Sequence, residues 1–229
     1  MTTSPSAHSI RRQVAPVPDA YGYLLEYAVL DDLRFLSHHD EITLLRRALV
    51  RAGLPVTHSR GFNPIPQMSL VLPRNVGVAS AMQLAQVKLD TEFATEKVFE
   101  QLHAVMPVQA PLRKVATAPR TAIRVTGTTF AVSIDPADRP NVLGRVAELQ
   151  SLKTYFIERD MGPKKPPRKT DIRGFVHELN LADDTLHMKL HVERQASARP
   201  AEILEALGLP ASRYLHRVCR TELLWQEAK

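Results

Sequence analysis

Apolar and polar positions in the first half of the chain alternate between strand-like and helix-like spacing. Residues 23–30 are rich in aromatic and aliphatic side chains, which is typical of a strand. Ser37 is a good N-cap, and Asp40 completes an approximate capping box for a helix that runs to about Ala52 and is ended by Gly53. On that helix, one face carries the apolar residues Ile42, Leu45, Leu49 and Ala52. Strands are further predicted at 55–58, 68–72, 84–89 and 108–116, with a second helix from 94 to 107. We interpret this order as the split βαβ, ferredoxin-like plan.

The second half resembles a degenerate copy of the first. Strict alternation over 186–192 places His187, Lys189 and His191 on an outward strand face. The other predicted elements are strands at 129–134, 155–157 and 215–224, helices at 141–152 and 200–207, and a short helix at 170–179. Asp183 and Asp184 fit a hairpin turn better than a metal site.

The predicted fold class is therefore α+β, with tandem ferredoxin-like units and antiparallel sheets. Residues 1–20 are polar, contain three prolines and lack an apolar signal-peptide core, so they are expected to be a disordered tail. The first unit is assigned to 21–120 and the second to 121–229, with the division near 119–124. The second unit includes a basic, proline-rich loop at 163–169.

Composition narrows the function classes. The 229-residue chain is 44% hydrophobic and has no apolar run of the roughly 20 residues that cross a bilayer, so we expect a cytoplasmic protein without a membrane partner. Cys219 is the only cysteine, which excludes an internal disulfide and a cysteine-ligated iron–sulfur cluster built from this chain alone. No histidine or cysteine spacing marks a zinc site, so no metal is predicted.

The chain is basic. A formal net charge of +6 favours an acidic partner, with RNA the first candidate. The alternative is a mildly basic protein with no nucleic-acid role. The positions of the positive charges along the chain therefore say more about RNA binding than the net charge does.

The densest polar chemistry lies in the segment 34–40, Arg-Phe-Leu-Ser-His-His-Asp. It places Arg34, His38 and His39 where a strand passes into a helix, and helix N-termini attract phosphate. A histidine with a near-neutral pKa also serves as a general acid or base, so His38 is the candidate catalytic residue. The alternative is that Ser37 and Asp40 only cap the helix while both histidines occupy surface positions.

Three further groups extend this candidate site. Arg46, Arg47 and Arg51 lie on the same helix, and Glu41 cannot neutralise all three. The loop Gly-Phe-Asn-Pro at 61–64 is stiffened by proline and could fold back over the helix start; its Phe62 could stack on a base, enter a partner's pocket or pin the loop to the core. The predicted RNA- or phosphate-binding residues are Arg34, His38, Arg46, Arg47, Arg51, Phe62, Asn63, Lys164, Lys165, Arg168 and Lys169.

Common catalytic motifs are absent from the sequence. No phosphate-binding P-loop, Rossmann glycine fingerprint or nucleophile elbow occurs, so hydrolase, kinase and dehydrogenase interpretations have little support. We therefore favour a non-enzymatic role that needs no cofactor of its own.

Several motifs together resemble the radical-SAM-linked protein family, a bacterial family of unknown function. The resemblance is carried by the segments 34–40, 46–55 and 59–66, by Ser69 and Gly77, and by 170–173, 197–200 and 220–222. It implies a radical SAM enzyme as partner, which would hold the iron–sulfur cluster and the S-adenosylmethionine. Members are encoded near ribosomal proteins and an RNase E/G-type ribonuclease, which implies a role in RNA or ribosome maturation. His39 occupies a variable position of the family's pattern, so His38 is the better candidate for a shared role.

Three functions remain open from the sequence. The leading hypothesis is an accessory protein of a radical SAM enzyme that binds RNA or presents an RNA or ribosomal substrate. The second is a metal-independent ribonuclease-like enzyme that uses His38, an idea resting on fold analogy. The third is a protein-interaction subunit without RNA binding, and the sequence predicts no particular oligomeric state.

Overall fold

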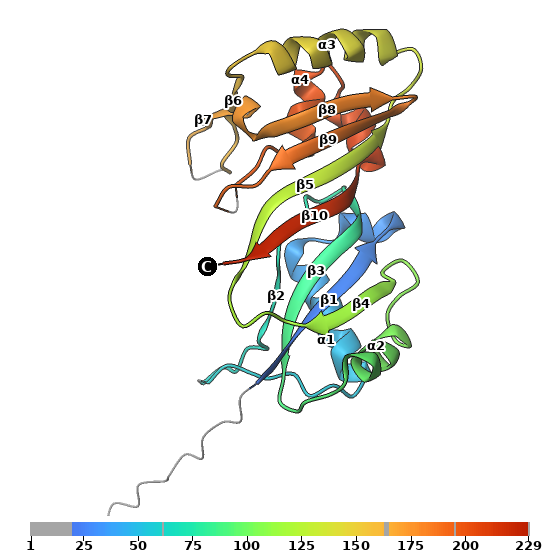
Figure 1. Ribbon diagram of the computed structural model, residues 1–229, viewed down its shortest axis with the longest axis vertical. Helices are drawn as coiled ribbons and strands as arrows, with labels where there is room; N and C mark the ends of the chain where they lie inside the picture. The colour runs from blue at the N-terminus through green and yellow to red at the C-terminus, as the bar shows by residue number, and fades with distance from the viewer. Residues whose placement is uncertain (1–19, 61, 163–164, 195, 229) are drawn as a thin grey trace, which may run out of the picture.

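The chain folds around one large, mostly antiparallel sheet (Figure 1). The structure is a computed structural model, which describes residues 20–60, 62–162, 165–194 and 196–228. Within them, eight strands form the main sheet and two more form a separate ribbon, accompanied by five α-helices. The protein is therefore of mixed α and β class, as predicted, while the tail predicted for 1–20 lies outside the described residues up to position 19. None of the described helices is long and apolar enough to cross a membrane.

The first half contributes four strands to one side of the sheet. β3 pairs with both β1 and β2, and β1 pairs with β4, all antiparallel. The elements are β1 (Tyr21–Val29), a 3-10 helix η1 (Asp31–Phe35), α1 (His38–Arg51), β2 (Met68–Leu70), β3 (Ala79–Leu89), α2 (Thr95–His103) and β4 (Leu112–Thr117).

The second half contributes the other four strands, in the order β10-β5-β9-β8 and again antiparallel. Its elements are β5 (Ile123–Ser133), α3 (Arg139–Ser151), β8 (Val176–Ala182), β9 (Thr185–His191), α4 (Pro200–Ala206), α5 (Ala211–Tyr214), η3 (Leu215–Arg217) and β10 (Cys219–Glu227). Between α3 and β8 the chain forms the two-stranded ribbon of β6 (Phe156–Arg159) and β7 (Arg168–Asp171), and then the short η2 (Arg173–Phe175).

The two halves join edge to edge. β10 pairs with β3 in parallel, through Cys219 opposite Ala79 and Arg220 opposite Ser80. This short contact makes one continuous sheet out of strands that lie more than 100 residues apart in the chain. The last strand of the sequence therefore lies at the centre of the sheet (Figure 1).

Locally encoded elements match their predictions. α1 begins at the N-cap Ser37 with both capping-box bonds to Asp40, and Gly53 follows it with a φ of +66°. The predicted inward face of α3 is buried, and so are Leu186, Met188 and Leu190 on β9. Asp183 forms the β8–β9 turn with a φ of +50°.

Several local predictions are wrong. The strands expected over 108–116 and 215–224 begin only at Leu112 and Cys219, because a turn and the 3-10 helix η3 occupy the residues before them. Residues 55–58 form no strand, because only isolated bridges join Val56 to Leu89 and His58 to Pro66. The helix expected over 170–179 is instead the end of β7, the 3-10 turn η2 and the start of β8, since pairing with β9 outweighs the weak helical spacing of Phe175 and Leu179.

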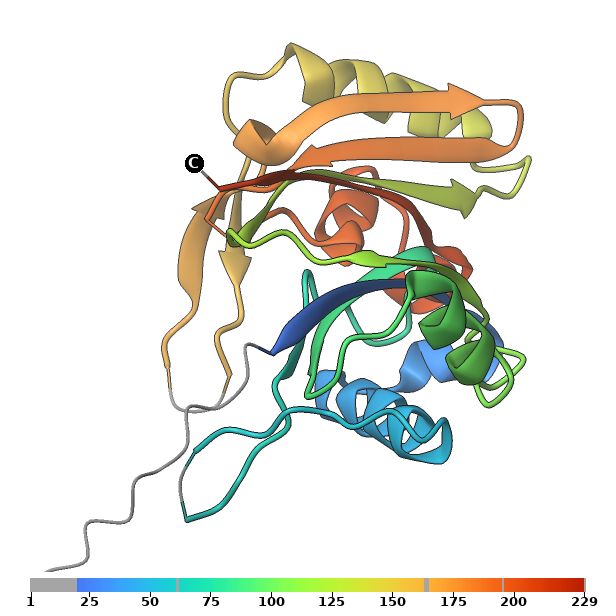
Figure 2. The same ribbon diagram turned by 60° about the horizontal axis from the view of Figure 1, so that its bottom comes forward.

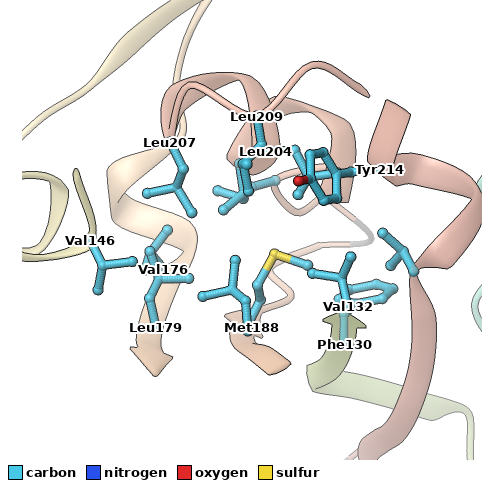
Figure 3. Close-up of a cluster of buried hydrophobic side chains, with 14 of the residues drawn as sticks. Phe130, Val132, Val146, Val176, Leu179, Met188, Leu204, Leu207, Leu209 and Tyr214 are labelled. Carbon is cyan, nitrogen blue, oxygen red and sulfur yellow. The ribbon is translucent and has the colours of Figure 1, made fainter. Parts of the chain in front are cut away.

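Separate apolar cores support the two halves. α1 and α2 pack on the first-half strands around Tyr27, Leu45 and Leu49. Figure 3 shows the second core, in which Met188 on β9 lies among side chains from β5, β8 and α4. A third, smaller cluster that includes Leu84 and Leu223 brings together residues of both halves. Because Leu45 and Leu49 of α1 belong to the first core, this core holds α1 against the first-half strands.

Candidate functional site

The N-terminus of α1 is closed by its own side chains. The amide of Asp40 donates to Ser37 Oγ at 3.2 Å, and Ser37 Oγ donates to Asp40 Oδ2 at 2.7 Å. The hydrogen bonds that the Ser37 hydroxyl and the Ser37 amide donate to the Asp40 carboxylate lower the pKa of Asp40 below its usual value. Asp40 therefore stays ionised and orients the first turn, on which both histidines are exposed.

A pocket of about 330 Å³ lies between the first turns of α1 and the segment that leads into β2. His38, His39 and Arg46 line it on the helix side, and Ile65, Pro66, Met68 and Ser69 line it on the other. We call it the histidine pocket. The end of the 59–66 loop therefore packs against the start of α1, so the two sequence motifs meet there.

Arg46 and Arg47 are the most available cations of α1. Both are exposed, and within the described part of the chain neither guanidinium makes a hydrogen bond or an ion pair. Arg46 also faces the histidine pocket. His58 and Arg60 on the neighbouring loop are exposed as well, although their sequence context did not single them out. This α1 surface is accordingly basic and open to solvent.

The other two predicted arginines of this region already have intramolecular partners. Arg34 Nε donates to the carbonyl of Asp31 at 2.7 Å, and its Nη1 donates to the carbonyl of His216 in the second half. Arg51 Nη2 donates to the carbonyl of Val105 at 2.9 Å. Both guanidinium groups therefore fasten loops to the framework, which reduces their freedom to contact a ligand.

Phe62 extends into solvent. Its side chain is fully exposed at 102%, and its neighbour Asn63 is exposed too. The loop that carries them extends away from the body of the protein below α1 (Figure 2). Phe62 therefore does not pin the loop to the core, which removes one of the three roles considered for it and leaves contact with a ligand or a partner.

The basic segment at 163–169 forms a second, separate patch. Arg168 and Lys169 belong to β7 rather than to a loop, and Lys169 Nζ lies 4.6 Å from the centre of the Phe156 ring. Lys165 is exposed, and Lys164 lies outside the described residues. The β6–β7 ribbon and the 58–66 loop both extend from the left side of the molecule in Figure 1, at different heights along its long axis. The structure thus does not merge the two basic segments into one patch.

A buried ionic network below the site was not expected from the sequence. Glu41, which the sequence reasoning treated as a surface acid, is only 2% exposed. Its Oε1 accepts a 2.7 Å hydrogen bond from the Tyr27 hydroxyl, and its Oε2 lies 3.2 Å from Arg74 Nε. Burial, and secondly the charge of Glu41, raises the pKa of Tyr27 well above its usual value. Glu41 therefore does not offset the surface arginines of α1.

Arg74 shapes the start of the site through backbone contacts. Its Nη2 donates to the carbonyls of Leu33 at 2.8 Å and Leu36 at 3.1 Å, and its Nη1 donates to those of Arg34 and Val78. One guanidinium thus satisfies the carbonyls that end η1, immediately before the N-cap Ser37. The only signal in the sequence is a lone arginine between two apolar stretches, which is too weak to identify this role.

Metal binding has no visible basis in the described ranges. Across residues 20–60, 62–162, 165–194 and 196–228, no three His, Cys, Asp or Glu side chains gather where they could hold a metal ion.

Comparisons with known proteins identify a family. No curated protein matches the chain. A solved structure described as an unknown protein from Galdieria sulphuraria is similar over 92% of this chain and 100% of its own, at 9% identity and a TM-score of 0.24. The family described as "Uncharacterized protein conserved in bacteria (DUF2344)" matches residues 23–200. Because this range is well over half of the 229 residues, the chain belongs to the DUF2344 family.

Proposed function

We propose that the protein is an RNA-binding accessory protein, and that its RNA site is the α1 surface formed by His38, His39, Arg46 and Arg47 together with Phe62. The observation that carries the proposal is the histidine pocket, which is lined by two imidazoles and one unpaired guanidinium. The loop that supplies Ile65 and Pro66 to this pocket also carries the exposed ring of Phe62. Cations contact the RNA backbone, and an exposed ring stacks on an unpaired base. The net charge of +6 adds long-range attraction.

The β6–β7 ribbon supplies a secondary contact in this proposal. Lys165, Arg168 and Lys169 are exposed and carry three positive charges. Because the ribbon is separate from the α1 surface, it would contact a different stretch of the same RNA. Arg34 and Arg51 would act indirectly, through the loops that they hold.

The proposed partner is a radical SAM enzyme, an assignment supported by the family resemblance of the sequence motifs. In this arrangement the partner carries the iron–sulfur cluster and S-adenosylmethionine. Cys219 is the only cysteine of the chain, and burial raises the pKa of its thiol. One such thiol cannot hold a cluster by itself.

We also propose that each half is a ferredoxin-like unit. The supporting observation is that each half contains the order β-α-β-β-α-β with matching strand neighbours, β4-β1-β3-β2 and β10-β5-β9-β8. The β6–β7 ribbon is then an insertion in the second unit. In tandem units of this kind the two sheets would share the β3–β10 edge.

RNA binding by the purified chain is the direct test. After removal of co-purified nucleic acid, a fluorescent single-stranded RNA is titrated at low and at physiological salt. We expect binding that weakens as salt rises, and we expect Arg46→Glu with Arg47→Glu to abolish it. Arg113→Glu with Lys114→Glu is the matched control, because both side chains are exposed on β4 and the change in charge is the same. Equal binding by the two double variants would disprove the α1 surface as the RNA site.

A ribonuclease-like activity is the second candidate, favoured by the position of His38 in the pocket beside Arg46. His38 would transfer a proton while a guanidinium stabilises the pentacoordinate phosphate. The test is cleavage of a short RNA by the wild type and by His38→Ala, with His103→Ala on α2 as control. Cleavage that survives in His38→Ala would exclude this role.

Salt-sensitive binding to the radical SAM enzyme without any RNA affinity would instead favour a pure protein-interaction subunit.

A further inference from the structure

A second pocket, lined by four arginines, lies where the two halves of the protein meet. Its volume is about 230 Å³, and it shares no lining residue with the histidine pocket. Arg74 comes from the segment before β3, Arg159 from the end of β6 and Arg220 from β10, while Arg199 precedes α4. We call this site the arginine pocket.

Arg220 is the unusual member of this group. Its side chain is among the largest in the fully buried part of the protein, with an exposure of 1%. Nε donates to Ser80 Oγ at 3.2 Å and Nη1 donates to the carbonyl of Leu72 at 3.1 Å, whereas Nη2 is buried without a hydrogen-bond partner. No carboxylate in the described ranges forms an ion pair with it. Burial lowers the pKa of Arg220 to about 10.

A buried charge without an ion pair is costly, because the guanidinium has lost its water. The attraction of Glu41 offsets only part of this loss, since the pKa of Arg220 is still lowered. Two of the four arginines already have a carboxylate partner, and neither carboxylate lines the pocket. Glu41 pairs with Arg74, and Glu202 holds Arg159 in a two-pronged contact of 2.7 and 2.6 Å. Arg199 is half-exposed at the rim, with its Nε 3.9 Å from Glu202. The lining of the pocket therefore contains four arginines and no carboxylate. Because every N–H group of Arg74 already has a partner, Arg159, Arg199 and Arg220 are the three that can contact an anion.

We propose that the arginine pocket binds the phosphate group of a small phosphorylated molecule. Guanidinium groups donate paired N–H bonds that match the oxygens of a phosphate, and the excess of positive charge favours an anion that carries two negative charges. The unpartnered Nη2 of Arg220 would supply a fixed donor, and Arg199 would close over the ligand from the rim. This site is additional to the proposed RNA surface, and it uses none of the same side chains.

The experiment is calorimetric titration of the full chain with inorganic phosphate and with glycerol phosphate, at constant ionic strength set by chloride. Acetate serves as the carboxylate control. We expect both phosphate compounds to bind and acetate to bind much more weakly. Arg220→Lys keeps the charge but lacks the second terminal nitrogen, so phosphate affinity should fall about tenfold or more. Arg199→Gln should weaken it several-fold, and Arg145→Gln on the exposed face of α3 should leave it unchanged.

Urea unfolding of each variant shows whether the variant is folded. If Arg220→Lys does not fold, Arg199→Gln still tests the proposal, because Arg199 lies at the rim of the pocket and its replacement should leave the fold intact. The proposal is wrong if phosphate binds no better than chloride, if acetate binds equally well, or if Arg199→Gln has wild-type affinity. A further outcome is that the wild type binds neither phosphate compound while Arg199→Gln loses RNA binding. This result would assign the pocket to an RNA surface and overturn the small-ligand proposal. The Arg46→Glu with Arg47→Glu variant should bind phosphate normally, which separates this test from that of the RNA surface.

Discussion

Glu41 and Arg74 form an ion pair in the interior, with side chains that are 2% and 1% exposed. The pair links the first turn of α1 to the segment between β2 and β3. Since the same Arg74 guanidinium binds the carbonyls that end η1, the pair fixes the backbone on both sides of Ser37. The position of His38 and His39 thus depends on a contact that is more than 30 residues away in sequence.

Glu41→Ala should destabilise the protein strongly. It leaves the Arg74 charge buried and unpaired, and breaking a buried pair in this way costs about 3–5 kcal/mol in the free energy of unfolding. Urea unfolding followed by circular dichroism measures the loss. Glu100→Ala removes an exposed carboxylate of α2 and should change the free energy of unfolding by no more than about 0.5 kcal/mol. Similar losses in both variants would contradict a structural role for the pair.

Stability should fall in acid, partly through Asp135. Hydrogen bonds from Arg217, and then from Arg213, hold the pKa of this carboxyl below its usual value. A carboxyl with a lowered pKa in the folded state stabilises the protein above its unfolded pKa of about 4, and this contribution disappears as the pH falls through the folded pKa.

The free energy of unfolding of Asp135→Asn should therefore vary less with pH than that of the wild type. Urea unfolding from about pH 5 to about pH 2 measures the difference. Part of the fall should remain in the variant, because hydrogen bonds also lower the pKa of Asp40 and Glu178. Asp183→Asn is the control, since Asp183 makes no ion pair within the described residues and Asn tolerates its positive φ. An unchanged pH dependence in Asp135→Asn would rule out the effect.

Ser37→Ala should loosen the start of α1. It removes the side-chain acceptor of the Asp40 amide and the hydrogen bond that the hydroxyl donates to the Asp40 carboxylate. Loss of an N-cap costs about 1 kcal/mol. Hydrogen exchange should accelerate selectively at the Asp40 amide, whereas Ser133→Ala, at an exposed serine of β5, should leave α1 protected. Unchanged exchange at Asp40 would show that the cap contributes nothing.

Phe62→Ala should affect binding and leave stability unaltered. The ring is fully exposed, so the free energy of unfolding should stay within about 0.5 kcal/mol of the wild type. If the proposed RNA surface is correct, loss of one stacking contact weakens RNA binding by about 1–3 kcal/mol. Val108→Ala changes another exposed apolar side chain and should alter neither quantity. RNA affinity at the wild-type level in Phe62→Ala would exclude stacking by this ring.

Short-range patterns in the sequence predicted much of the local structure. Ser37 and Asp40 are three residues apart, so their capping contact depends on helical geometry alone. The alternation over 186–192 likewise implies one buried face of a strand. Residues 170–179 show the limit of such reasoning, because the spacing of Phe175 and Leu179 suggested a short helix. Pairing with β9 decided that the chain from Val176 onward is a strand.

The sequence by itself therefore determined the caps, the turns and the amphipathic faces, and it brought attention to the segment 34–40. Tertiary structure alone decided that Glu41 is buried, that Arg34 and Arg51 bind backbone carbonyls, and that β10 joins the halves beside β3. The physical reason is the separation along the chain of the residues that interact. A cap or an alternating strand depends on neighbours within a few residues, whereas the partner of a charged side chain depends on which distant segments the packed core brings beside it.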